Sequence, residues 1–351
     1  MTRTEKVARL VSLVRTIQTE SEGASDALRT PVGAPLEDIA DLSATRQALE
    51  KTFRDPAPEL DDDEVAGLEA IVLTRGRPVA FIRDSRYDPL PAPWAHLNAD
   101  PVRQRLQPLL NSVGRVELPN SSIPYGGTAF VVGPDLLMTN RHVAALFTVG
   151  LGTRGLLYNA GNAAIDFRRE VGSAATTHVE VSKVVMMHPY WDMALLRVRG
   201  LPAAHPALKL SIRPPDELVG RDVIAVGYPA LDSRNDIELQ NRIFQSTYEV
   251  KRLQPGKFRG RESIRSFETR VNAATHDSST LGGNSGSAVL DPSTGEAVAL
   301  HFAGAYLKAN YAVPTYELAR DPRVVAAGLN FSDVVPATNE FDAAWARAGG
   351  E

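Results

Sequence analysis

The stretch GTAFVVGPDLLMTNRHVA, residues 127–144, sets the pattern of most of the chain. Its apolar runs at 129–132 and 136–138 flank Gly133-Pro134-Asp135, which predicts two buried strands joined by a tight turn. His142 follows the second run, where we expect a short helix to begin. A side chain at this point is held rigidly and stays partly open to substrate, as a general base requires. A lone His after a strand is more often structural, so its role depends on partners elsewhere in the chain.

The same rhythm continues on both sides, from about Ser112 to Leu329. Short runs rich in Val, Ile and Leu alternate with Gly, Pro, Asn and Asp turns, among them VGRVEL, VEVSKVVMM, DVIAVGY and AVALHFAG. Such spacing predicts a mainly β region that closes into a barrel or a pair of barrels.

An acidic residue precedes one of these strands, in HPYWDMALLRVRG at residues 188–200. Asp192 could accept the Nδ1–H of a His, fix its tautomer and stabilise the imidazolium. The structural alternative is an Asp that caps the strand. Asp166 and Asp222 are the other candidates for orienting His142.

A glycine-rich segment, STLGGNSGSAVL at residues 279–290, carries the strongest signal. Its glycines allow positive φ and a close approach of substrate. Ser285 lies in the tight turn as a candidate nucleophile, and the backbone N–H groups of Gly283 and Ser285 could form an oxyanion hole. A Gly-rich turn before a strand is the structural alternative.

These three segments together resemble the trypsin-like and chymotrypsin-like serine proteases. TNRHV is similar to the family's His motif, DMALL to its Asp motif and GGNSGS to its nucleophile motif, in the chain order His, Asp, Ser. The resemblance covers residues 112–329 and implies two six-stranded antiparallel β-barrels with the site between them. It also implies a His142, Asp192 and Ser285 triad that hydrolyses peptide bonds through an acyl-enzyme, with no metal and no organic cofactor.

In this family the residues before the oxyanion glycine line the S1 pocket. Trypsin has an Asp six residues before its nucleophile, whereas this chain has Ser279, so no preference for Arg or Lys is implied. Thr280 and His301 resemble the pocket of bacterial glutamyl endopeptidases and of viral cysteine proteases that cleave after Gln, with Ala303 and Gly304 on the same strand edge. A Glu or Gln preference at P1 is therefore expected. The alternative is a His that is satisfied inside the second barrel.

The front of the chain has a different pattern. Val7, Leu10, Val11, Val14 and Ile17 fall at helical spacing, and a second helix is expected from about residue 37 to 53. We assign residues 1–55 to a helical module. The acidic run at 61–64 is expected to be a linker or a charged helix start.

Residues 56–111 are expected to contain a linker and a hairpin of two strands around Arg75-Gly76, followed by a short helix near 101–110. Residues 1–111 as a whole could regulate the barrel, bind a partner protein or brace the barrel, and we expect regulation or partner binding rather than a direct part in the active site. Residues 330–351 are expected to form a tail in which FDAAWARA is a short helix that docks back.

Composition limits the remaining possibilities. The 351 residues carry a net charge of -4 and no cysteine, so nucleic acid, an anionic membrane and disulfides are not expected. The N-terminus lacks a signal-peptide pattern, which favours the cytoplasm. The layout resembles bacterial multidomain trypsin-like proteases of conflict and signalling systems. A catalytically silent peptide-binding pseudoprotease and an HtrA-like chaperone-protease are the alternatives.

Overall fold

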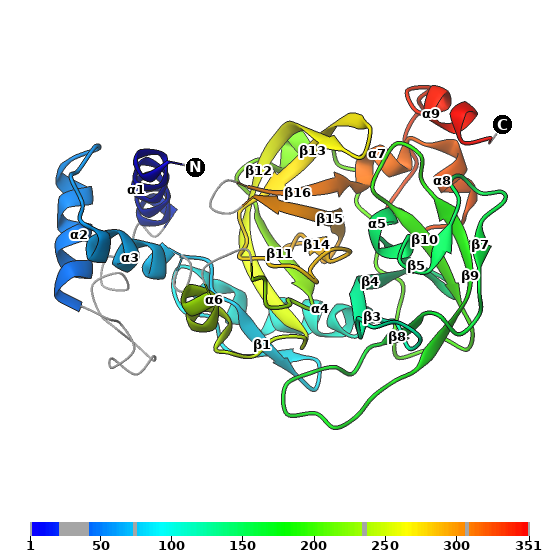
Figure 1. Cartoon of the computed structure of the whole chain (residues 1–351), viewed down its shortest axis with the longest axis horizontal. Coiled ribbons are helices and arrows are strands. Elements are labelled where there is room, and N and C mark those ends of the chain that lie inside the picture. Colours follow the sequence, from blue (N-terminus) through cyan, green and yellow to red (C-terminus); the bar gives the residue numbers. More distant parts are fainter. Residues whose placement is uncertain (1, 21–41, 73–75, 234–236, 306–308, 350–351) are drawn as a thin grey trace.

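Two six-stranded antiparallel β-barrels form the central part of the protein (Figure 1). The computed structural model describes residues 2–20, 42–72, 76–233, 237–305 and 309–349. The first barrel closes in the order β10-β5-β4-β3-β8-β9. Its strands are β3 (Val113–Glu117), β4 (Tyr125–Gly133), β5 (Leu136–Thr139), β8 (Ala164–Asp166), β9 (Val179–Met187) and β10 (Ala194–Val198).

The continuous apolar run of β4 is explained by burial on both of its faces. Ala129 and Val131 belong to the core of the first barrel, whereas Phe130 and Val132 belong to a larger cluster that both barrels share. Successive side chains of a strand point to opposite faces. A strand at this position therefore needs apolar residues throughout.

The second barrel is a ring in the order β11-β14-β15-β16-β13-β12, closed by pairing of β11 with β12. Its strands are β11 (Asp222–Gly227), β12 (Arg252–Ser266), β13 (Thr269–His276), β14 (Ala288–Leu290), β15 (Ala297–Ala305) and β16 (Ala309–Pro314). The fold expected from the sequence is thus confirmed. Shorter elements connect these strands, namely α5 (Arg141–Ala144), β6 (Thr148–Val149), β7 (Leu157–Tyr158), η4 (Pro215–Leu218) and α6 (Ile237–Phe244).

The segment before the barrels extends the second barrel. β1 (Ala80–Arg83) pairs with β12 and with β2 (Arg86–Tyr87). After η3 (Trp94–Asn98), α4 (Asp100–Leu110) buries Leu106 and Leu110 in the cluster shared by both barrels. The helix expected near 101–110 is confirmed, and this segment packs against the second barrel through β1 and α4.

The hairpin expected around Arg75-Gly76 is wrong. Residues 68–71, where its first strand was expected to begin, belong to α3 (Asp62–Ile71), and residues 73–75 lie outside the described part of the chain. Asp61 caps the helix and Glu64 bonds back to the Asp61 N–H, so a complete capping box starts a helix where the apolar pattern suggested a strand. The acidic run is therefore a helix start.

Three helices at the N-terminus share a core of their own. α1 (Arg3–Glu20) and α2 (Leu42–Arg54) pack with α3 through an apolar cluster that includes Leu10, Val14, Leu49, Val65 and Leu68. The expected start of α2 near residue 37 lies outside the described residues. In Figure 1 the three helices lie to one side of the second barrel, next to α6.

The C-terminal segment returns to the barrels through α7 (Thr315–Ala319), α8 (Pro322–Ala326) and α9 (Asp342–Arg347). Trp345 of α9 is fully buried, and its indole N–H donates to Asp321 Oδ2 at 2.7 Å. The short helix expected in FDAAWARA is confirmed. Within the described residues, none of the helices combines the length and apolar character that crossing a lipid bilayer requires.

Candidate active site

Strand pairing in the first barrel brings His142 and Asp192 together. Thr139 at the end of β5 is opposite Ala194 at the start of β10, so the residues that follow one strand lie beside those that precede the other. His142 Nδ1 lies 2.7 Å from Asp192 Oδ2, and the His142 backbone N–H donates to Asp192 Oδ1 at 3.0 Å. Because the carboxylate can only accept, the ring carries its hydrogen on Nδ1 and leaves Nε2 as an acceptor.

Hydrogen bonds from Asn140 and Arg141 hold the segments that carry His142 and Asp192, while the His142 side chain remains accessible to solvent. Asn140 Nδ2 donates to the Asp192 carbonyl at 2.8 Å, and Arg141 Nη1 donates to the His188 carbonyl at 3.1 Å. The Asp192 side chain is 6% exposed and that of His142 39% exposed. The other two candidate carboxylates have different partners. Asp166 accepts a hydrogen bond from the Thr177 backbone N–H, and Asp222 forms an ion pair with Lys257.

The turn around Ser285 has an orientation that depends on glycine. The Ala230 N–H donates to the Gly282 carbonyl at 2.6 Å, and in a planar trans peptide the Gly283 N–H must then point the opposite way. Gly283 has φ +80°, and a Cβ there would lie 2.3 Å from the Tyr228 carbonyl oxygen. Within the described residues, neither the Gly283 nor the Ser285 N–H donates a hydrogen bond.

The first barrel contacts this turn directly. The Thr128 N–H donates to the Ser285 carbonyl at 2.8 Å, and Thr128 Oγ1 donates to the Gly283 carbonyl at 2.9 Å. A Cβ on Gly127 would lie 2.6 Å from the Ser285 carbonyl oxygen and 2.9 Å from Val143, the neighbour of His142. Gly127 therefore lets the His142 and Ser285 loops approach each other closely. Among the described contacts the Ser285 hydroxyl makes no hydrogen bond.

A buried amide pair fixes the residue before Ser285. Asn284 is fully buried, and Gln254 Nε2 donates to its Oδ1 at 2.9 Å while Asn284 Nδ2 donates back to Gln254 Oε1 at 3.2 Å. Ser287 Oγ also donates to Asn284 Oδ1, at 3.3 Å. Side chains of the second barrel thus set the conformation of this turn.

A cavity of about 340 Å³ opens beside Ser285. All five residues expected at the S1 pocket line it: Ser279, Thr280, His301, Ala303 and Gly304. The Ser279 hydroxyl donates to the Arg77 carbonyl at 2.7 Å, and the Thr280 hydroxyl donates to Asn310 Oδ1. Both hydroxyls therefore shape the walls of the cavity.

His301 belongs to a chain of buried groups. Its Nδ1 lies 3.2 Å from His276 Nε2, and His276 Nδ1 lies 3.1 Å from Ser278 Oγ. Burial lowers the pKa of His276 to about 4. Burial, with the charges of His276 and His142, holds the pKa of His301 well below its ordinary value. Both imidazoles are therefore neutral at neutral pH.

The N-terminal region also contributes to this cavity, contrary to the expectation that it would stay apart from the site. Leu13 of α1 and Val72, directly after α3, line the cavity together with side chains of α6. Arg77 also lines it and pairs with Asp277 at 2.7 Å. Burial would raise the pKa of Asp277, but Arg77, Arg259 and the Lys257 backbone N–H together outweigh burial and lower it to about 2.

Sequence reasoning missed His276, Asn310 and Arg77. His276 lies nine positions before Ser285 in the printed sequence, and a second His so near the nucleophile was the one available signal. No signal in the sequence pointed to Arg77, because its position depends on how the N-terminal part of the chain packs.

Comparison with known proteins shows which family the chain is similar to. The model of the trypsin-like peptidase domain matches residues 127–300. A probable serine protease of Lysobacter enzymogenes is 30% identical over an alignment of 288 positions that covers 73% of this chain and 74% of that protein. Serine protease Rv3671c of Mycobacterium tuberculosis is 29% identical over 164 residues, 46% of this chain and 35% of its own length.

Similar solved structures include the active form of Rv3671c, with a TM-score of 0.43, 20% identity and coverage of 69% of this chain and 90% of that chain. Another is Deg5, with a TM-score of 0.44, 21% identity and coverage of 64% and 94%. The chain belongs to the trypsin-like serine protease family. It is a serine endopeptidase.

Proposed function

We propose that Ser285, His142 and Asp192 form the catalytic triad, and that the Gly283 and Ser285 N–H groups form the oxyanion hole. The observation that carries this proposal is the pair of hydrogen bonds between Asp192 and His142. It leaves His142 Nε2 without a hydrogen and ready to accept the Ser285 proton. The Gly283 and Ser285 N–H groups, which donate no hydrogen bond within the described residues, supply the donors of the oxyanion hole.

The reaction follows from these positions. Ser285 Oγ attacks the scissile carbonyl carbon while His142 Nε2 takes the hydroxyl proton, and the negative charge develops on the carbonyl oxygen. The Gly283 and Ser285 N–H groups donate to that oxygen. His142 then protonates the leaving amine, and a water molecule, activated by the same ring, hydrolyses the acyl-enzyme.

The Ser285→Ala variant tests this assignment. It removes the attacking oxygen from a residue whose hydroxyl makes no hydrogen bond among the described contacts, so the fold should be retained. Peptide turnover should fall by about 10⁴- to 10⁶-fold. Turnover equal to that of the parent protein would refute the assignment.

The cavity beside Ser285 supports a preference for Gln or Glu at P1. If the Ser278 hydroxyl donates to His276 Nδ1, then His276 donates through Nε2 to His301 Nδ1, and Nε2–H is the remaining donor of His301. A neutral N–H donor suits the carbonyl oxygen of a Gln amide and can also bond a carboxylate. Arg77 already neutralises Asp277, so no unpaired carboxylate from that residue attracts Arg or Lys.

The N-terminal helices support a regulatory role. Leu13 and Val72 line the same cavity as Ser285 and His301, so the three-helix core forms part of the wall at which substrate binds. A movement of these helices would change the size of the pocket without touching His142 or Asp192. We propose that binding of a partner protein to residues 1–72 controls access to the site in this way.

A further inference from the structure

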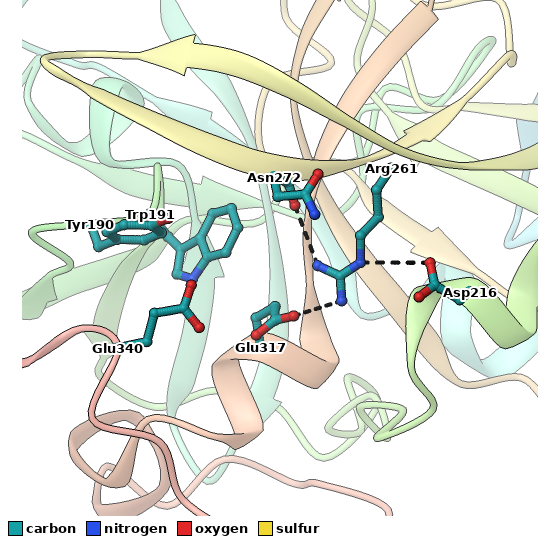
Figure 2. A pocket seen from close by; sticks show the side chains of 7 residues that line it. All are labelled: Tyr190, Trp191, Asp216, Arg261, Asn272, Glu317 and Glu340. Carbon is teal, nitrogen blue, oxygen red and sulfur yellow. Dashed lines mark hydrogen bonds and ion pairs between the residues drawn. The ribbon is translucent and has the colours of Figure 1, made fainter.

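A second cavity, of about 530 Å³, lies where both barrels meet the C-terminal segment (Figure 2). Tyr190 and Trp191 reach it from the loop that carries Asp192. Arg261 comes from β12, Glu317 from α7, and Glu340 from the chain before α9. The cavity therefore lies behind the Asp192 loop and is lined by other residues than the S1 cavity.

Trp191 brings an unsatisfied donor to this cavity. The residue is 2% exposed, and within the described residues its indole N–H has no hydrogen-bond partner. Figure 2 shows the indole nitrogen pointing toward the side chain of Glu340. A buried donor without an acceptor is costly, so this position favours a ligand that supplies an oxygen.

The charges around the cavity favour a cation. Arg261 pairs with Glu317 Oε1 at 2.6 Å and reaches Asp216 only at 3.9 Å. Arg320 takes the other Glu317 oxygen at 2.9 Å and lies 3.9 Å from Glu340. Among the described residues, three carboxylates thus share two guanidinium groups, and the one ion pair of Glu340 is the long one to Arg320.

The aromatic rings suit the same ligand. Tyr190 and Trp191 are edge-to-face neighbours, with ring centroids 5.1 Å apart. Burial, and then the charges of Glu340 and Glu317, raise the pKa of the Tyr190 hydroxyl. Aromatic faces next to carboxylates bind ammonium and guanidinium groups well.

We propose that this cavity is a second peptide-binding site, which takes an Arg or Lys side chain of a bound peptide. The side-chain cation lies between Glu340 and Glu317 against the Tyr190 ring. A backbone carbonyl of the same peptide accepts the Trp191 indole N–H. One short basic peptide then supplies both the cation for the carboxylates and the oxygen acceptor for the Trp191 indole N–H.

Occupation of this site acts on the loop that carries Asp192. His188 Nδ1 accepts the backbone N–H groups of both Tyr190 and Trp191 at 3.1 Å, so these residues and Asp192 belong to one tight turn. A peptide that fixes Trp191 therefore also restrains Asp192, which follows it directly in the chain.

The test measures binding of Ac-Ala-Arg-Ala-NH₂ to the full chain carrying Ser285→Ala, by isothermal titration calorimetry. The matched probe replaces Arg with citrulline, which has nearly the same shape without the charge. We expect saturable binding of the Arg peptide and binding of the citrulline peptide that is at least about tenfold weaker, because a hydrogen-bonded charge pair is lost. A Lys peptide should bind in the same site.

Two variants locate the site. Trp191→Phe keeps the ring but removes the N–H, and Glu340→Gln removes one charge, and each should weaken binding by about fivefold or more. Asp333→Asn removes an exposed charge of the same C-terminal segment outside the cavity and should leave affinity unchanged.

Three results would overturn the proposal. They are no binding at millimolar peptide, equal binding of the Arg and citrulline peptides, and binding that neither Trp191→Phe nor Glu340→Gln alters. Loss of binding after a fluorophosphonate blocks Ser285 in the parent chain would also contradict it, by placing the peptide in the S1 site. The calorimetric result does not depend on catalysis, so it stands apart from the test of the triad.

Discussion

Both carboxylate oxygens of Asp192 contact His142, one through the backbone N–H at 3.0 Å and the other through the ring at 2.7 Å. The same side chain therefore positions the residue and selects its tautomer. Because Asp192 is almost completely buried, water does not compete for these bonds.

The Asp192→Asn variant tests this relationship. An amide that presents its NH₂ group to Nδ1 forces the ring hydrogen onto Nε2, where it can no longer accept the Ser285 proton. We expect kcat to fall on the order of 10⁴-fold, with a melting temperature close to that of the parent. Asp222→Asn is the control, since Asp222 pairs with Lys257 and His96, and it should keep full activity. Equal kcat values for Asp192→Asn and the parent would contradict the geometry.

His301→Ala should weaken P1 selection. The variant removes the donor offered to a Gln or Glu side chain, and a hydrogen bond to a desolvated group is worth about 1–3 kcal/mol. The kcat/KM for peptides with Gln or Glu at P1 should therefore fall about 10- to 100-fold. Peptides with Ala at P1 serve as the internal control and should change little. If the parent protein prefers Arg at P1 in a peptide library, the pocket assignment is wrong.

Stability should depend on pH through the buried histidines. The pKa of His276 is about 4 in the folded protein against an ordinary value of 6.5. Between these two values the unfolded chain holds a proton that the folded chain does not, so the free energy of unfolding decreases as pH falls from 6.5 toward 4. His301 acts in the same direction.

The His276→Gln variant isolates this contribution. Denaturant unfolding of parent and variant is measured at several pH values between 7 and 4, and the parent should lose up to about 1.4 kcal/mol per pH unit more than the variant. Parallel curves would show that His276 takes up its proton at the same pH in the folded and the unfolded protein, and would contradict its lowered pKa.

Removal of residues 1–72 should open the S1 cavity. With Leu13 and Val72 absent, KM for peptide substrates should fall, giving a gain in kcat/KM on the order of tenfold if about 1.4 kcal/mol of occlusion is lost. A deletion of residues 1–55 is the comparison. It leaves Leu60, Val65 and Leu68 without their partners in the helical core and should lower the melting temperature. Unchanged kinetics in a folded protein that lacks residues 1–72 would remove the regulatory role.

The barrels could be predicted because their signals are local. Alternating or continuous apolar runs and turn residues appear in stretches such as 127–144, and the glycines around Ser285 are required by backbone contacts that any protein with this turn must make. The five S1 residues were implied by the resemblance to the trypsin-like family, and they line one cavity because they lie on the two segments that flank the nucleophile turn.

The remaining features depend on long-range packing. Residues 68–71 were expected to begin the first strand of a hairpin, but the Asp61–Glu64 capping box and burial against α1 and α2 make residues 62–71 a helix. Arg77 reaches the S1 wall through contacts 200 or more positions away in sequence, with Asp277 and Ser279, and no local pattern shows this. The cytoplasmic location and a role in signalling or defence stay predictions.

The most direct test of the triad is covalent labelling of the parent chain with a fluorophosphonate, followed by intact-mass measurement and peptide mapping. A serine is phosphonylated rapidly only when a base removes its proton and an oxyanion hole accepts the charge. We predict one adduct per chain, located on Ser285, that is absent in Ser285→Ala and forms much more slowly in Asp192→Asn. No adduct on Ser285, or equally fast labelling of Ser285 and Ser287, would contradict the account.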